Sequence, residues 1–289
     1  MLDVKTLFRI LNTDNNSVDS ILRNIDRYYY LNSTPKLDKQ GNQLYDKYNR
    51  PRSRDIYPAV GKLKGIQKSI LTKLLSCIKL PDYAFGGVKK RDNILNAKRH
   101  QGNKFFFNTD LRGYYPGITN KQVFDMFVKY KFAPSVAHNL TKLTTYKGML
   151  PQGTHTSPYI ANLVFSEAGS KLQEFAENRG LTFTTFVDDL TFSSKQDFKH
   201  LIPEIIEIIT SSGFRISHNK TFYQTKNPKV TQVIVKNNCL CLDSYYRKKI
   251  DGFNETELMT PKALGTINYF ERVKKVGRAS KKKVFGSVN

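Results

Sequence analysis

The chain of 289 residues contains 47 Lys and Arg against 24 Asp and Glu, a formal net charge of +23 with the histidines neutral. Hydrophobic residues make up 39% and aromatic residues 12%, which excludes a disordered chain. The length exceeds one typical domain of about 150 residues, so two or three subdomains are expected. The apolar content predicts a globular protein. The surplus of positive charge predicts a polyanionic partner.

No run of about 18 apolar residues occurs, and the N-terminal segment MLDVKTLFRI lacks the long apolar core of a signal peptide. We therefore expect no membrane span and no secretory signal, and a protein that acts where it is made. Cys77, Cys239 and Cys241 are too few for a disulfide framework and lack the second half of a zinc site. They are expected to be reduced and inert.

Three amphipathic helices are predicted in the first part of the chain. Apolar residues recur at helical spacing over residues 18–25 and again over residues 63–78, where the pattern stops before Pro81. Thr119 is a suitable N-cap for a third helix that continues through Phe127. The segment between the first two helices is rich in Asn, Lys and Arg and is expected to be a loop.

The middle of the chain alternates between strand and helix patterns. The aromatic run KFFFNTD at 104–110 predicts a buried strand that ends in a carboxylate, and 158–178 predicts a long helix closed by Gly180. Further expected elements are strands at 181–187 and 190–193, a helix before Gly213, and strands at 214–216 and 230–235. The order βαββαβ indicates an α+β fold with a palm-like sheet.

Two acidic positions stand at the ends of these predicted strands. Asp110 ends the first strand, and Asp188 and Asp189 occupy the expected turn of the next hairpin, so antiparallel pairing would bring the carboxylates together. Two like charges about 4 Å apart repel by roughly 4 kcal/mol at an effective dielectric of 20. Either a pKa rises or a divalent cation lies between them, and Mg²⁺ suits such oxygen ligands. Alone, an Asp-Asp pair could equally be a polar hairpin turn.

Four segments occur in a fixed order: FFFNTDLRGYYPGI, LPQGTHTSPYIANLVF, FTTFVDDLTFSS and GFRISHNKT. Together they resemble the successive sequence blocks of reverse transcriptases, specifically the bacterial retron-type group, with coverage over residues 52–231. The resemblance implies a right-hand polymerase. Its fingers would comprise 1–103 and 119–149, its palm 104–235 and its thumb 236–289, with no RNase H segment after the thumb.

Carried over residue by residue, the resemblance implies a two-metal site. Asp110 and Asp188 would bind both Mg²⁺ ions, Asp189 would assist, and Leu111 would offer its backbone carbonyl as a further ligand. Lys220, in the NKT of the fourth segment, matches the lysine that would protonate the departing pyrophosphate. The segment FVDD has Phe186 where the group more commonly has Tyr.

The resemblance also implies a set of nucleotide-binding residues. Tyr115 matches the aromatic steric gate that excludes a ribose 2′-hydroxyl, although a core tyrosine is an alternative interpretation. Gln152 and Gly153 match the loop that holds the incoming nucleotide and the template, and Leu111 is also counted among the nucleotide-binding candidates. Of three upstream arginines that resemble the triphosphate-binding fingers segment, we favour Arg54, and a general surface role remains its alternative.

Two marks distinguish retron enzymes from other reverse transcriptases. The segment NAKRH, from Asn96 to His100, fits the NAxxH signature, whereas Val-Thr-Gly occurs here as Val-Thr-Gln with Gln232 in place of Gly. We count Asn96, His100 and Thr231 as RNA-binding candidates, and a satisfied surface histidine is the alternative for His100. The basic C-terminal segment adds further candidates, Lys281, Lys282 and Lys283, and the spacing of Leu264, Ile267 and Phe270 predicts a helix that docks it onto the palm.

The resemblance implies a location in the bacterial cytoplasm and specific partners. They are deoxynucleoside triphosphates, a cognate structured non-coding RNA that serves as template and primer, its branched RNA–DNA product, and an effector protein in phage defence. Two alternatives stay open. One is a bacterial defence reverse transcriptase outside the retron group. The other is a vestigial polymerase that only binds RNA, against which the intact Asp110, Asp188, Asp189 and Lys220 argue.

Overall fold

The computed structural model describes residues 2–38, 41–46, 48–253 and 260–278. The chain divides into two compact units that interleave along the sequence. Unit 1 comprises Met1–Pro81 and Gly113–Glu167, and unit 2 comprises Asp82–Arg112 and Ala168–Asn289. The chain therefore crosses between the units three times, the last time within the long helix α8 (Ser157–Asn178).

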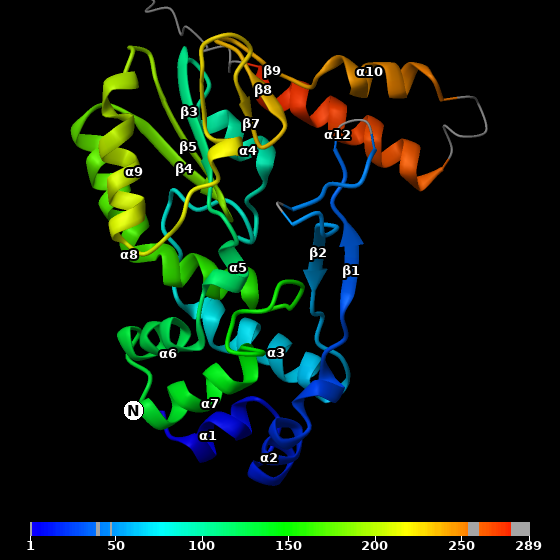
Figure 1. The fold of residues 1–289 in the computed structure, drawn as a ribbon, viewed down its shortest axis with the longest axis vertical. Helices are drawn as coiled ribbons and strands as arrows, with labels where there is room; N and C mark the ends of the chain where they lie inside the picture. Colours follow the sequence, from blue (N-terminus) through cyan, green and yellow to red (C-terminus); the bar gives the residue numbers. More distant parts are fainter. Residues whose placement is uncertain (1, 39–40, 47, 254–259, 279–289) are drawn as a thin grey trace, which may run out of the picture. The chain divides into compact units, whose positions relative to one another are not determined.

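Unit 1 is mainly helical, and the three helices predicted there are confirmed (Figure 1). The Asp14 side chain caps the first of them, and Thr119 with Gln122 forms a capping box at the start of the third. Their apolar faces bury residues such as Ile21, Leu63 and Phe127. The helices of unit 1 are α1 (Val4–Ile10), α2 (Asn15–Arg23), α3 (Gly61–Lys73), α5 (Tyr114–Gly117), α6 (Asn120–Lys129), α7 (Pro134–Thr144) and the first half of α8, with 3₁₀ turns at Ile25–Tyr28 and Leu75–Cys77.

Unit 1 also contains a two-stranded antiparallel ribbon where the sequence predicted a loop. Strand β1 (Asn32–Pro35) pairs with β2 (Ser53–Ile56), with Asn32 opposite Ile56. The residues of β1 are all exposed, so the ribbon shows no alternation of apolar and polar residues. Its strands are held by backbone hydrogen bonds instead, and a prediction based on hydrophobic periodicity cannot detect them.

The main sheet of unit 2 has four antiparallel strands in the order β4-β5-β3-β6 (Figure 1). They are β3 (Phe105–Asp110), β4 (Thr182–Phe186), β5 (Asp189–Ser194) and β6 (Phe222–Gln224). With α8 before β4 and α9 (Ile202–Ser211) after β5, the expected α+β class is confirmed, and so is the expected order up to α9. The strand expected at 214–216 is wrong: Ile216 makes one isolated bridge to Leu111, and the strand that pairs with β3 at this edge of the sheet is β6.

A second, three-stranded sheet of unit 2 consists of β7 (Lys229–Val230), β8 (Val233–Val235) and β9 (Leu240–Cys241). The single strand expected at 230–235 is thus a hairpin, whose turn is Thr231 and Gln232. The two residues adopt φ values of 45° and 71°, the left-handed conformation of a two-residue hairpin turn. Short 3₁₀ turns at Lys199–Leu201 and His218–Lys220 complete the connections of the unit.

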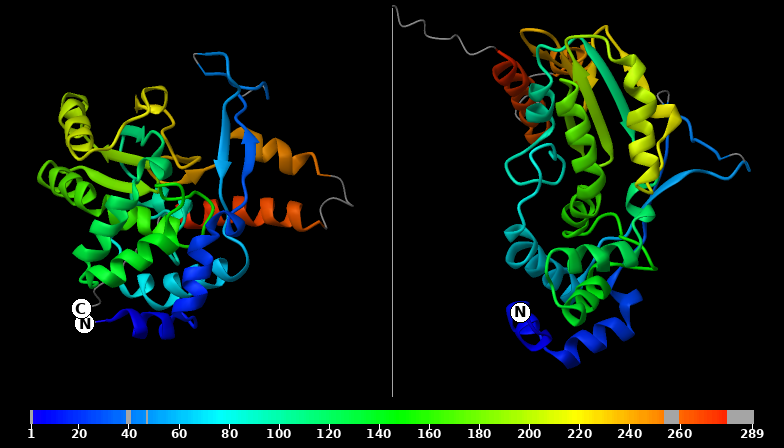
Figure 2. Two further views of the ribbon diagram at one scale, coloured as in Figure 1. Left: turned by 60° about the horizontal axis from the view of Figure 1, so that its bottom comes forward. Right: turned by 90° about the vertical axis from the view of Figure 1, so that its left-hand side faces the viewer.

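Helix α9 lies on one side of the main sheet, and α4 (Asn93–Arg99) and α12 (Pro261–Gly277) lie on the other (Figure 2). A short helix, α10 (Ser244–Asp251), packs on α12. The predicted helix near the C-terminus is confirmed, and of its expected docking face Ile267 and Phe270 are half-buried. Ala263, Val273 and Gly277 are buried, whereas Leu264 is exposed. The small residues permit close approach, since a Cβ on Gly277 would lie 2.3 Å from the Leu240 nitrogen.

The three cysteines are free thiols, as expected. Cys77 is exposed, and the sulfur atoms of Cys239 and Cys241 lie 3.6 Å apart without a bond between them. Within the described ranges, no helix combines the length and the apolar character that crossing a membrane requires.

Candidate active site

The acidic residues meet where β3 ends and β5 begins. Asp110, the last residue of β3, lies directly opposite Asp189, the first residue of β5. The hairpin between β4 and β5 pairs Phe186 with Asp189, so the two turn residues are Val187 and Asp188. This corrects the expectation that both aspartates form the turn, because Asp189 already belongs to the ladder.

Backbone hydrogen bonds connect this hairpin to the end of β3. The Leu111 N–H donates to the Asp188 carbonyl at 2.8 Å, and the Ser217 N–H donates to the Asp110 carbonyl at 2.8 Å. The Leu111 side chain is buried, which anchors the chain directly after Asp110. The aspartates are therefore held together by main-chain contacts that do not depend on their own charges. The metal-binding role of the Leu111 carbonyl stays a prediction.

The β4–β5 turn is strained, and the segment before α4 packs against it. Val187 has a φ of 60°, which is unfavourable for a β-branched residue. The segment before α4 pairs with β4, since the Phe85 N–H donates to the Thr185 carbonyl and the Thr185 N–H to the Tyr83 carbonyl, each at 2.8 Å. A Cβ on Gly86 would lie 2.5 Å from the Val187 nitrogen. Sequence reasoning missed Gly86 as a positioning residue, although the adjacent pair Gly86-Gly87 could have indicated it.

Lys220 contacts the acidic cluster directly. Its Nζ donates a hydrogen bond of 2.6 Å to Oδ2 of Asp110, from a 3₁₀ turn that follows the Ser217 contact. The Asp110 side chain is only 9% exposed, whereas that of Lys220 is 60% exposed. The exposed ammonium can therefore leave or approach the buried carboxylate through side-chain rotation alone. The sequence placed both residues in the same catalytic set, and the structure brings them together.

The crowding of negative charge in the cluster affects the pKa of Asp189. Burial is the largest cause that raises this pKa to about 6, and the charges of Asp188 and Asp110 raise it further, while Lys220 lowers it. The residue faces solvent on its open side, but the protein around the carboxylate still limits its hydration. A carboxyl group whose neighbours disfavour its ionised form indicates that negative charges converge here without full compensation.

The donor chemistry of this cluster fits a hard divalent cation. Carboxylate oxygens are the ligands that Mg²⁺ prefers, and a cation would relieve the repulsion that raises the pKa of Asp189. No group of three or more His, Cys, Asp or Glu side chains in the described parts of the chain is already arranged around a common metal position. Mg²⁺ commonly retains waters and takes phosphate oxygens from its substrate, so the protein need not supply a complete cage.

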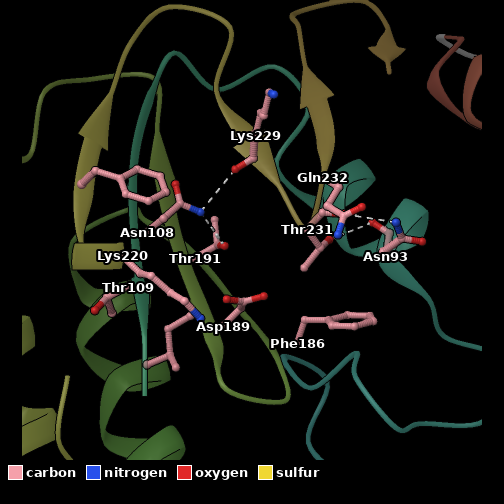
Figure 3. A pocket seen from close by; sticks show the side chains of 12 residues that line it. Asn93, Asn108, Thr109, Phe186, Asp189, Thr191, Lys220, Lys229, Thr231 and Gln232 are labelled. Carbon is pink, nitrogen blue, oxygen red and sulfur yellow. Dashed lines mark hydrogen bonds between the residues drawn. The ribbon is translucent and has the colours of Figure 1, made fainter. Parts of the chain in front are cut away.

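A pocket of about 440 Å³ opens beside Asp189 and Lys220 (Figure 3). Figure 3 shows the Asp189 carboxylate and the Lys220 ammonium pointing toward each other at one end, with the Phe186 ring nearby. The hairpin turn of Thr231 and Gln232 forms the opposite wall. The remaining lining residues are Asn93, Asn108, Thr109, Leu190, Thr191, Phe222 and Lys229.

The predicted RNA-binding residues of α4 are buried in unit 2. His100 is 0% exposed, and its ring nitrogens lie 2.7 Å from the hydroxyls of Ser193 and Thr184, one on β5 and one on β4. Burial lowers the pKa of His100 to about 3, so the ring is neutral. Asn96 is 1% exposed. The prediction that these two side chains contact RNA directly is therefore wrong for this structure.

The two distinguishing marks of the sequence instead contact one another. The Asn96 Nδ2 lies 3.4 Å from the Thr231 hydroxyl, and the Asn93 Nδ2 donates to the Thr231 carbonyl at 3.1 Å. His100 joins α4 to the main sheet, and Asn93 and Asn96 join α4 to the β7–β8 turn. Helix α4 thereby positions the turn that lines the pocket. Unlike Asn96 and His100, Thr231 is only half-buried, so part of it is accessible to solvent. Its role in RNA binding stays a prediction. Lys281, Lys282 and Lys283 lie outside the described residues.

Of the predicted nucleotide-binding residues, Leu111 belongs to unit 2, and Arg54, Tyr115, Gln152 and Gly153 belong to unit 1. The Gln152 carbonyl accepts from the Tyr57 N–H at 2.7 Å, and a Cβ on Gly153 would lie 3.4 Å from that of Ile56, so this loop packs against the end of β2. Exposed Arg54 is part of β2. Half-buried Tyr115 lies on α5 with its ring 5.8 Å from that of the preceding, buried tyrosine.

Comparison with known proteins identifies the family. A model described as "Reverse transcriptase (RNA-dependent DNA polymerase)" matches residues 53–238. The chain belongs to the reverse transcriptase family. It is similar to the retron Ec86 reverse transcriptase of Escherichia coli, with 34% identity over 173 residues that cover 59% of this chain and 54% of that protein. The retron Se72 reverse transcriptase of Salmonella heidelberg is 35% identical over 147 residues, 50% of this chain and 39% of the relative.

A third relative, the retron Mx162 reverse transcriptase of Myxococcus xanthus, is 27% identical over 206 residues, 60% of this chain and 42% of that protein. The resemblance to the retron group is thus confirmed. The matches span between 39% and 54% of the length of these three relatives. In this reverse transcriptase chain, the matched range 53–238 contains the acidic cluster, Lys220 and the β7–β8 turn.

Proposed function

We propose that the chain is an RNA-directed DNA polymerase whose reaction centre is the acidic cluster of unit 2. The observation that carries the proposal is the position of Asp110 opposite Asp189, with Asp188 in the adjoining turn and Lys220 on Asp110. Membership of the reverse transcriptase family supports the same chemistry. A cluster that is costly without cations is expected where phosphoryl transfer takes place.

Asp110, Asp188 and Asp189 would hold two Mg²⁺ ions, with the Leu111 carbonyl as a further ligand. When bound, the ions stabilise negative charge on the attacking and leaving oxygens of an in-line displacement. The backbone bonds at Leu111 and Ser217 keep the carboxylates in place as their charges change. Lys220 would carry its proton at Nζ, from which it can donate to Asp110 or to a departing pyrophosphate.

The nucleotide-binding residues of unit 1 are proposed by family resemblance. Tyr115 would contact the sugar of the incoming deoxynucleotide, Gln152 and Gly153 its base and the template, and Arg54 its triphosphate. The expected fingers, palm and thumb extend this proposal to the whole chain. In the palm range 104–235 lie the main sheet and the acidic cluster, and in the thumb range lie α10 and α12.

The relatives named above support a more specific proposal. A cognate structured non-coding RNA would serve as template and primer, and the product would be a branched RNA–DNA molecule that acts with an effector protein in phage defence. The net charge of +23 is consistent with a nucleic-acid partner.

Primer extension tests the proposed reaction. The parent chain should extend a DNA primer on an RNA template when Mg²⁺ is added, and Asp188→Asn should abolish synthesis while the fold is preserved. Because the variant removes like-charge repulsion, its thermal stability without metal should stay level or rise. Asp125→Asn, on the exposed face of α6, is the matched control and should retain activity. Clear residual synthesis by Asp188→Asn would refute the assigned centre.

Sequencing of the nucleic acid that co-purifies with the chain tests the retron assignment. One discrete branched species is expected. A mixture of unbranched nucleic acids with intact primer extension would favour a defence reverse transcriptase of another group. Bound RNA without any extension by the parent chain would favour a vestigial RNA-binding protein.

A further inference from the structure

A second pocket of unit 2, of about 470 Å³, lies at the other end of the main sheet from the acidic cluster. Strand β3 begins at this pocket and ends at Asp110, and six residues separate Lys104 from Asp110, or about 20 Å of strand. Three exposed lysines line the pocket: Lys104, Lys195 and Lys236. The other lining residues are Gly102, Asn103, Thr225, Asn227, Pro228, Val235 and Asn237, so no acidic residue takes part.

The backbone holds each lysine at a defined position. The Lys104 N–H donates to the Ser194 carbonyl at 3.0 Å, immediately before Lys195, and the Lys236 N–H donates to the Cys239 carbonyl at 3.0 Å. Asn103 fixes the turn before β3, since its Nδ2 donates to the Ser193 hydroxyl at 2.7 Å. The backbone therefore fixes where each lysine begins, and the Lys104 Nζ lies 5.4 Å from the centroid of the Phe105 ring, a contact that leaves its charge unpaired.

The charges of these lysines are not balanced by the fold. The last pair of the β3–β5 ladder is Phe105 with Ser194, so Lys104 and Lys195 flank it on neighbouring strands, and like charges in such positions are destabilising. Among the described residues, neither they nor Lys236 form an ion pair. The nearby Asp197 accepts hydrogen bonds from the Lys199 N–H and the Tyr223 hydroxyl instead.

We propose that this pocket, the lysine pocket, binds backbone phosphates of the structured RNA that the chain carries. The inference rests on the proposed function, because it takes the polyanionic partner to be RNA. Lysine ammonium groups contact phosphates as mobile point charges without reading sequence, and folded RNA is recognised largely through shape and backbone. Phosphates bound here would anchor the RNA about 20 Å from the acidic cluster and leave that cluster accessible.

The test compares the parent chain with a triple variant, Lys104→Gln, Lys195→Gln and Lys236→Gln, in binding to a stable RNA hairpin. Each phosphate contact adds about 1 to the slope of log affinity against log salt, so the slope should fall by about 3. Affinity should fall about tenfold or more at physiological salt. A matched control, Lys62→Gln, Lys64→Gln and Lys68→Gln on α3, removes the same number of exposed charges and should change both quantities less.

Two further measurements separate the possible outcomes. Extension of a DNA primer on a homopolymer RNA template at saturating concentration should be unchanged in the lysine-pocket variant. If the parent chain does not extend primers, the proposed function fails, and hairpin binding still decides on the pocket. Equal losses in both triple variants would indicate a nonspecific charge effect and overturn the inference. Unchanged hairpin binding would also overturn the inference. This holds even if the lysines then prove to bind inorganic phosphate or an acidic protein.

Discussion

At the scale of single residues, Asp189 and His100 are titratable groups with opposite dependence on pH. The pKa of Asp189 is raised to about 6, so the folded chain binds this proton more tightly than the unfolded chain. The pKa of His100 is lowered to about 3 by burial, so the folded chain binds that proton less tightly. Between about pH 4 and 6, rising pH therefore lowers the free energy of unfolding through Asp189 and increases it through His100.

We predict that Asp189→Asn isolates the first contribution. Without metal, the stability gained by this variant over the parent should grow as the pH rises from 3.8 through about 6, because the parent then ionises Asp189 beside Asp188 and Asp110. Thermal unfolding of both proteins across this pH range measures the difference in stability. The contribution of His100 is the same in both proteins and does not affect this difference. Added Mg²⁺ should reduce it, since a cation favours the ionised cluster. Parallel profiles of parent and variant would contradict the assigned pKa.

Tyr115 provides a prediction on sugar selection. If the ring rather than the hydroxyl excludes ribonucleotides, Tyr115→Phe should discriminate almost as the parent does, whereas Tyr115→Ala should incorporate ribonucleotides more readily. Primer extension with matched ribo- and deoxyribonucleotides measures the ratio. The Tyr114 ring, 5.8 Å away, is buried and supports the position from within the fold. If neither variant changes the ratio, another residue is the gate.

At the scale of elements, the β4–β5 hairpin depends on a neighbour that is distant in sequence. Gly86→Ala would place a Cβ 2.5 Å from the Val187 nitrogen, a backbone atom that cannot yield without moving the turn. We expect a loss of stability of about 1–3 kcal/mol and a larger loss of primer extension, since Asp188 shares the turn. Denaturant unfolding and activity measure the two effects.

Gly65→Ala on α3 is the control for this substitution. No atom lies within 4 Å of its added Cβ, and alanine is the better helix former, so stability should stay level or rise. Similar stability and activity for Gly86→Ala and the parent would show that the turn does not need this close contact.

At the scale of the whole molecule, the net charge of +23 predicts RNA binding with a strong salt dependence. The triple variant of Lys281, Lys282 and Lys283 to Ala should lower RNA affinity and flatten the salt slope, while the rate at saturating template is unchanged. Binding isotherms between about 50 and 200 mM salt test this. An unchanged affinity and slope would exclude this segment as the RNA contact and leave the lysine pocket as the stronger candidate.

Local patterns in the sequence predicted the elements whose burial is periodic and the residues whose type is chemically restrictive. Helices α2, α3, α6 and α8 and strands β3 to β5 follow from local patterns, because a buried face repeats at the period of its own backbone. The approach of Asp110 to the Asp188–Asp189 pair followed from strand ends and antiparallel pairing. The family followed from the order of four segments.

Features that depend on distant partners could be seen only in the folded chain. Register places Asp189 in the ladder and strained Val187 in the turn, and backbone pairing builds the polar β1–β2 ribbon. Buried His100 contacts β4 and β5, and buried Asn96 contacts the β7–β8 turn. Both residues therefore position α4 and this turn. Helix α12 faces the core with Val273 and with Gly277, where close approach to β9 leaves no room for a side chain. Local periodicity contains no information on which distant segment supplies the other half of a contact.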